Sequence, residues 1–159
     1  MNLQEEQYVH FAYSIENLNT ARKILQEIKK SADHPLVNPA FQFALIEYSK
    51  PYRRSRGTIK KEQHILGNEH VPVKHSEMHK RILAARDEIH AHTDLTVREA
   101  TLCVVDIERE RTVFTTQNVI RGNEELQNID AIIDLIEQTL DSMIKELKLL
   151  EAALPLTPE

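Results

Sequence analysis

The amino-acid sequence predicts a mainly α-helical protein, an antiparallel helical bundle with one inserted β-hairpin. Long stretches place apolar residues three and four positions apart, which is the spacing of one buried helix face. Prolines separate several of these stretches, and helices usually end at or before the residue that precedes a proline. One pair of short segments is instead rich in β-branched residues, as strands are.

The first predicted helix runs over residues 3–30 and ends before Pro35. Its apolar positions are Phe11, Ile15, Leu18, Leu25 and Ile28. The second helix is predicted to begin at Asn38 as its N-cap, because an Asn side chain accepts hydrogen bonds from the free N–H groups of a first turn. Pro39 would be its first helical residue, where the missing N–H costs nothing, and Pro51 marks its end.

Residues 51–74 are irregular in sequence, with a short helix expected around 59–66. A third helix is predicted from Ser76, as its N-cap, to about Thr93. Its buried seam consists of Met78, Ile82, Ala85 and Ile89. Segments 101–107 and 112–116 then predict the hairpin, with the charged turn 108–111 between them.

The last predicted helix has the clearest apolar stripe. The stripe consists of Leu126, Ile129, Ile133, Ile136, Leu140, Met143, Leu147 and Leu150. Ile132, Leu135 and Ile144 widen it, which favours a helix embedded in its own bundle over a dimerising coiled coil. We therefore expect one helical domain over residues 1–153 and a flexible tail over 154–159.

The composition excludes several classes of protein. A chain of 159 residues, with 41% apolar and 28% charged residues, fits one domain. It has neither an apolar run of the roughly 20 residues that cross a bilayer nor an apolar export segment at its start, so we expect a cytoplasmic protein without membrane contact. Cys103 is the single cysteine, which excludes an internal disulfide and a cysteine-based metal site.

A basic patch follows the second predicted helix in a chain whose net charge is −5. It consists of Lys50, Arg53, Arg54, Arg56, Lys60 and Lys61. Such clusters bind phosphate backbones because their binding releases the counterions condensed on the nucleic acid. Tyr48 and Tyr52 would add stacking on bases. The alternative is a solvated loop whose charges keep the protein soluble.

The second candidate site ends the third predicted helix, where a guanidinium, two imidazoles and three carboxylates fall within residues 86–94. Arginine holds phosphate through a planar fork and histidine exchanges protons near neutral pH, so this set suits chemistry on a phosphodiester. Arg86 and His90 share one helix face, whereas Arg86 and His92 lie about 120° apart. Alternatively, Arg86 forms an ion pair with a neighbouring carboxylate and the histidines stabilise the helix C-terminus. The three carboxylates are those of Asp87, Glu88 and Asp94.

Most histidines are concentrated in one part of the chain: His64, His70, His75, His79, His90 and His92. His75 and His79 are one helical turn apart, a spacing that can chelate a metal, but the sequence specifies no third ligand. We therefore expect no metal and no other cofactor, and expect the histidines to gather around a substrate phosphate.

Three segments in this order resemble the HEPN superfamily, helical domains of many prokaryotic RNases and nucleotide-binding proteins. They are Tyr48-Ser49-Lys50-Pro51-Tyr52, His79-Lys80-Arg81-Ile82-Leu83-Ala84-Ala85-Arg86-Asp87, and Ala91-His92-Thr93-Asp94. They look most like the branch related to abortive-infection proteins. The resemblance covers roughly residues 38–94 by motif and the rest only by helical layout. Asp87 departs from the pattern, since active members often have Asn after the arginine.

The resemblance implies a metal-independent endoribonuclease of a toxin or phage-defence system, in which the RNA 2′-hydroxyl attacks the adjacent phosphate. His92 would transfer the proton, Arg86 would stabilise charge on the phosphate, and Asp87 would orient Arg86 or polarise the site. His90, Asp94 and the basic patch would bind the substrate. Partners would be RNA or a nucleotide, a second copy of the chain with its motif facing the first, and an antitoxin protein. The alternatives are a non-catalytic module that binds a nucleotide or nucleic acid, and a structural helical adaptor.

Overall fold

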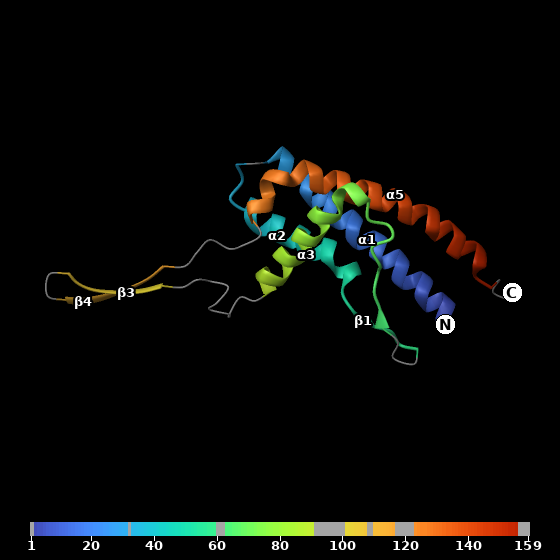
Figure 1. The fold of residues 1–159 in the computed structure, drawn as a ribbon, viewed down its shortest axis with the longest axis horizontal. Coiled ribbons are helices and arrows are strands. Elements are labelled where there is room, and N and C mark those ends of the chain that lie inside the picture. The colour runs from blue at the N-terminus through green and yellow to red at the C-terminus, as the bar shows by residue number, and fades with distance from the viewer. Residues whose placement is uncertain are drawn as a thin grey trace.

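The computed structural model describes residues 2–31, 33–59, 63–90, 101–107, 110–116 and 123–155. Over these residues the chain is a helical bundle with a long antiparallel hairpin, which confirms the predicted fold class (Figure 1). The α-helices are α1 (Leu3–Lys30), α2 (Val37–Ser49), α3 (Ser76–His90) and α5 (Ile129–Ala153). Short 3-10 helices are η1 (Lys50–Tyr52), η2 (Val73–His75) and η3 (Asn123–Asn128). The strands are β1 (Ser55–Arg56), β2 (Gln63–His64), β3 (Thr101–Ile107) and β4 (Glu110–Thr116).

The two longest helices, α1 and α5, pack antiparallel along their lengths. Tyr8 near the start of α1 donates a hydrogen bond of 2.8 Å to Glu151 near the end of α5, and Lys29 at the end of α1 pairs with Asp130 at the start of α5. Helix α2 turns back along α1, and α3 packs on α2. None of the helices within the described ranges combines the length and apolar character that crossing a bilayer requires.

The apolar stripe of α5 forms one side of the core, as predicted. Its centre is fully buried, and Leu140 is only 3% exposed. The same core takes residues from every other α-helix: Leu18, Ala21, Leu25, Ile28, Phe41, Ala44, Leu45, Tyr48, Met78, Ile82 and Ala85. The predicted seam of α3 is therefore confirmed at the three of its positions whose side chains are described. Ile144, which was predicted to widen the stripe, is exposed instead, and so is Leu149 on the outer face of α5.

Two predicted helix starts are wrong by one or two residues. Helix α2 begins at Val37, because the turn at His34 already closes with a 3.0 Å hydrogen bond from the Val37 N–H to the His34 carbonyl. Asn38 and Pro39 therefore lie inside the first turn and Asn38 is not the cap. Ser76 is not a cap either, because η2 runs directly into α3 and gives Ser76 helical angles, φ −58° and ψ −38°.

The helix expected around residues 59–66 does not form where the chain is described. Residues 55–56 and 63–64 pair instead as two short antiparallel strands, with Ser55 opposite His64. The Pro51 carbonyl accepts the Leu66 N–H at 2.8 Å, which holds the returning segment against η1. The predicted extension of the third helix to Thr93 lies outside the described residues.

The hairpin matches the prediction in its strands and differs in its turn. Its register runs from Thr101 opposite Thr116 to Ile107 opposite Glu110, so Glu110 and Arg111 belong to β4 rather than to the turn. The ribbon extends away from the helices (Figure 1). Its large apolar side chains are exposed: Leu102, Val104, Val105, Val113 and Phe114. Exposed apolar surface of this kind is typical of an interaction site.

Candidate functional site

The two candidate sites of the sequence meet at one hollow, which we call the Arg86 hollow. It has a volume of about 350 Å³ and lies between α1, the segment 50–55 and α3. Its cationic lining consists of Lys50, Arg53, Arg54 and Arg86, and the rest of its lining consists of His10, Tyr13, Ser14, Asn17, Pro51 and Ser55. The structure therefore brings half of the basic patch to the arginine of the second site.

Local structure explains why the basic segment faces this hollow. Pro51 has no N–H and cannot continue α2, so the chain tightens into η1, and the Arg53 N–H donates to the Lys50 carbonyl at 3.2 Å. From there the chain continues into β1, whose Ser55 contacts His10 of α1. Arg86 approaches from α3, one turn beyond the fully buried Ile82.

Asp87 holds two guanidinium groups together beside the hollow. Its carboxylate accepts a hydrogen bond from Arg53 at 2.5 Å and one from Arg86 at 3.1 Å. Arg53 also donates to the Leu83 carbonyl at 3.2 Å. The ion pair anticipated for Arg86 is thus present, yet 28% of the Arg86 side chain stays exposed and lines the hollow.

Positive charge exceeds negative charge at the Arg86 hollow. Lys50 pairs with Glu47, and Asp87 is shared between two arginines. Arg54 is exposed, and the ion pairs of the described part of this segment are made by its neighbours Lys50 and Arg53. This surplus of positive charge favours an anionic ligand, because cationic side chains that line a concave site strengthen the local electric field and attract anions.

The α1 wall of the hollow was not anticipated from the sequence. His10, Tyr13, Ser14 and Asn17 occupy positions i, i+3, i+4 and i+7, which is one face of a helix. A stripe of polar residues at this spacing is a signal that the sequence does contain. Tyr13 is 62% exposed, so its ring is accessible to a ligand.

Tyr48 and Tyr52, expected to stack on bases, are buried instead, and that expectation is wrong. Tyr48 hydrogen bonds to His79 Nδ1 at 2.7 Å, and the Tyr52 ring lies 4.5 Å from the His79 ring. His79 Nε2 hydrogen bonds to Asn68 at 3.1 Å. Burial raises the pKa of both tyrosines and lowers the pKa of His79. These rings belong to the interface of α2 and α3.

The histidines with described side chains do not gather around one phosphate site. His75 pairs with Asp134 at 2.8 Å, whereas His79 is held by Tyr48 and Asn68, so the two do not converge on a shared ligand. His70 contacts Ser142 at 3.0 Å. Each ring has a separate partner because the helices carry them to different faces.

Several predicted site residues are not placed at the Arg86 hollow. His92, Asp94, Lys60 and Lys61 lie outside the described residues, as does the side chain of His90. Arg56 is exposed on β1 and is not part of the lining.

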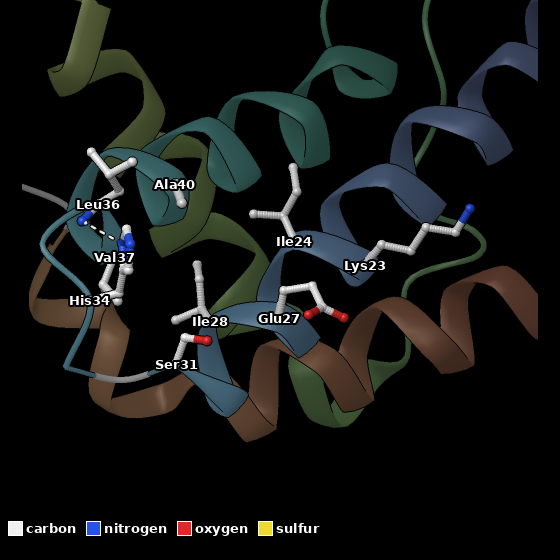
Figure 2. Close-up of a pocket in the computed structure, with 9 residues that line it drawn as sticks. All are labelled: Lys23, Ile24, Glu27, Ile28, Ser31, His34, Leu36, Val37 and Ala40. Carbon is white, nitrogen blue, oxygen red and sulfur yellow. Dashed lines mark hydrogen bonds between the residues drawn. The ribbon is translucent and has the colours of Figure 1, made fainter.

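A second, largely aliphatic hollow of about 430 Å³ lies at the other end of α1 (Figure 2). Ile24, Ile28, Val37 and Ala40 contribute its apolar lining. Near the start of α2, the Leu36 N–H donates a hydrogen bond of 3.2 Å to His34 Nδ1 at the edge of this hollow. This lining does not suit a phosphate.

Comparison with protein-family models, with curated proteins and with solved structures gave no match. The chemistry of the Arg86 hollow is therefore the basis for assigning a function.

Proposed function

We propose that the chain is a cytoplasmic, metal-independent endoribonuclease of the HEPN type that binds an RNA phosphate in the Arg86 hollow. The observation that carries this proposal is the set of four cationic side chains, Lys50, Arg53, Arg54 and Arg86, which line one hollow. Guanidinium groups bind phosphate through paired N–H donors. The resemblance to the HEPN superfamily further implies a role in a toxin or phage-defence system, with an antitoxin protein as partner.

The partners of the two central arginines support phosphate binding. Asp87 engages one terminal nitrogen of each, and a guanidinium has five N–H donors. Arg53 Nε is buried and has no hydrogen-bond partner among the described residues. A buried donor without a partner is uncommon in proteins, and a phosphate oxygen would satisfy it only once the Arg53 side chain turned toward the hollow.

The proposed reaction uses side chains alone. The RNA 2′-oxygen bonds to phosphorus, the bond from phosphorus to the 5′-oxygen breaks, and the products are a 2′,3′-cyclic phosphate and a 5′-hydroxyl. Arg86 stabilises the negative charge that develops on the phosphate oxygens. His92 is the proposed residue for proton transfer, which a positioned imidazole performs near neutral pH.

The purified protein is expected to cleave RNA in the presence of EDTA and to leave cyclic phosphate ends. An oligonucleotide of the same sequence with 2′-deoxyribose at the cleaved position should remain intact, because it lacks the attacking hydroxyl. Binding of both oligonucleotides without cleavage would replace the ribonuclease by the non-catalytic binding module. Absence of both binding and cleavage would leave the structural adaptor.

The same assay separates the two histidines at the end of the motif. His92→Ala should lower the rate at saturating RNA by about 10²-fold or more, as loss of a general acid or base does. His90→Ala should leave that rate nearly unchanged, because His90 is expected only to bind substrate. The reverse result would assign the reaction to Arg86 and His90 on one helix face.

We also propose that the active protein is a homodimer. Arg86 and His92 are about 120° apart on an ideal helix, and a facing motif from a second copy would complete the site. The exposed apolar side chains of the hairpin support self-association. Light scattering at about tens of micromolar, a concentration suited to ordinary dimer affinities, should therefore give the mass of a dimer. A monomer at that concentration would contradict a composite site.

A further inference from the structure

His10 is the one imidazole whose described side chain reaches the Arg86 hollow. Its Nε2 atom is in hydrogen-bond contact with the Ser55 hydroxyl. The ring also borders a smaller hollow, lined by Gln7, Phe11 and Leu66 among others. The His10 ring therefore lies at the edge of the space in which we propose that RNA binds, and its Nε2 atom already accommodates a hydroxyl group that lines the same hollow.

A second imidazole fixes the orientation of the His10 ring. The His64 ring stacks on it with centroids 4.9 Å apart and an angle of 24° between planes. His64 Nε2 is in turn hydrogen bonded to the Glu6 carboxylate at 2.7 Å. Stacking on one face and the Ser55 contact at the ring edge leave the His10 ring little freedom, as preorganised catalytic groups require.

Glu6 anchors this arrangement from within α1. Its buried carboxylate accepts the N–H groups of Thr58 and Ile59 at 2.9 Å each, as well as the Thr58 hydroxyl. These hydrogen bonds lower the pKa of Glu6 to about 2, and those from the Thr58 and His64 side chains contribute most. Glu6 is therefore ionised at neutral pH and holds Thr58 and Ile59, which follow β1, against α1.

Gly57 allows this close approach. A Cβ atom at residue 57 would lie 1.9 Å from a Glu6 carboxylate oxygen and 2.6 Å from His64 Nε2. Since both groups are held by hydrogen bonds, they cannot simply move aside. The absence of a side chain at this position is thus part of what keeps His64 over His10.

We propose that His10 is the general base of the cleavage reaction, with its Nε2 atom accepting the proton of the RNA 2′-hydroxyl. This inference rests on the proposed ribonuclease function. The substrate hydroxyl takes the place of the Ser55 hydroxyl at Nε2. As the 2′-oxygen bonds to phosphorus, its proton passes to His10, and the departing 5′-oxygen receives a proton from the second proton-transfer residue, His92. Each catalytic histidine then has one role.

The surroundings of His10 favour the neutral form that a base requires. Burial, followed by the proximity of His64, lowers the pKa of His10, and the Glu6 carboxylate only partly opposes them. The other titratable or charged groups of this hollow are Tyr13 from α1, Lys50, Arg53 and Arg54 from the segment after α2, and Arg86 from α3. At pH 7 the ring is therefore mostly uncharged and able to accept a proton.

A substrate with sulfur in place of the bridging 5′-oxygen gives a sharp test. A thiol has a much lower pKa than an alcohol, and a leaving group of lower pKa departs more readily, so the thiolate leaves without being protonated. The sulfur substrate therefore rescues the loss of a general acid but not the loss of the base. His10→Gln should slow single-turnover cleavage about 10²-fold on both substrates, whereas the defect of His92→Ala should disappear on the sulfur substrate. His34→Gln, an exposed histidine near the far end of α1, is the matched control and should leave both rates unchanged.

The outcomes separate this inference from the proposed function. If the wild type does not cleave RNA, the proposed function fails and the role of His10 fails with it. If the wild type cleaves and His10→Gln cleaves equally fast, or recovers on the sulfur substrate, the role of His10 as base is wrong while the ribonuclease stands. If thermal unfolding shows that His10→Gln does not fold, the pH dependence of the wild-type protein provides the test instead. Its rate on the sulfur substrate should fall as the pH drops through the His10 titration midpoint measured by NMR, and a rate without that dependence overturns the inference.

Discussion

Arg86→Ala is expected to lower kcat/KM for RNA cleavage by about 10²–10³-fold, the usual effect of removing one charge-stabilising donor from a catalytic site. The guanidinium lines the hollow and is oriented by Asp87 at 3.1 Å. Its contribution should be largest in the transition state, when an additional negative charge develops on the phosphate. The kinetic loss should therefore fall mainly on kcat, with a smaller change in RNA affinity measured by anisotropy.

The matched control for this prediction is Lys148→Ala. Lys148 is exposed on α5 and does not line the hollow, yet its removal changes the net charge of the protein by the same amount. If both variants lose activity equally, the effect comes from overall electrostatic attraction of RNA and not from the Arg86 hollow. Arg86→Lys adds a second comparison, because lysine keeps the charge and lacks the planar fork. It should recover RNA affinity better than it recovers kcat.

Leu140→Ala is expected to lower the free energy of unfolding by about 2–5 kcal/mol, as buried leucine truncations do. Leu140 is 3% exposed on the core face of α5, between α-helices that cannot collapse fully onto the cavity left behind. Urea unfolding followed by circular dichroism measures the loss, and an unchanged dependence on urea would show that the unfolded state is not affected.

The same helix offers a control with the same chemical change. Leu149 is 65% exposed on the outer face of α5, and Leu149→Ala should alter the stability by less than about 0.5 kcal/mol, as surface substitutions usually do. A loss for Leu140→Ala no larger than that for Leu149→Ala would mean that the α5 stripe does not form the core.

The Arg86 hollow also changes how the ion pairs of the motif are interpreted. An exposed pair contributes only about 0–1 kcal/mol to stability, so the contacts of Asp87 with Arg53 and Arg86 have little value as a structural device. Their geometric effect is larger, because one carboxylate brings two guanidinium groups to the same site. This favours a binding role for the motif over that of a purely structural adaptor.

The site could be predicted from the sequence only in pieces. Arg86 was identified by its neighbours in the chain, and Lys50, Arg53 and Arg54 were identified as a basic patch, but no local pattern indicated that they line one hollow. His10 was missed because a single histidine on a polar helix face carries no motif. Tyr48 and Tyr52 were misjudged because aromatic residues beside basic ones suit both RNA stacking and a core.

The sequence by itself determined the elements whose signals are local. Helical spacing identified α1 with its bounds, the buried face of α5 and the seam of α3, and β-branched residues identified the hairpin. Two helix starts were wrong by one or two residues, since whether a turn at His34 leads into α2 depends on one hydrogen bond.

Only the tertiary structure decided which faces meet. The contact of His10 with Ser55 joins residues 45 positions apart, and that of Arg53 with Asp87 joins residues 34 apart. The physical reason is that periodicity states which face of a helix is buried or polar, whereas the partner of each face depends on how all the helices pack together.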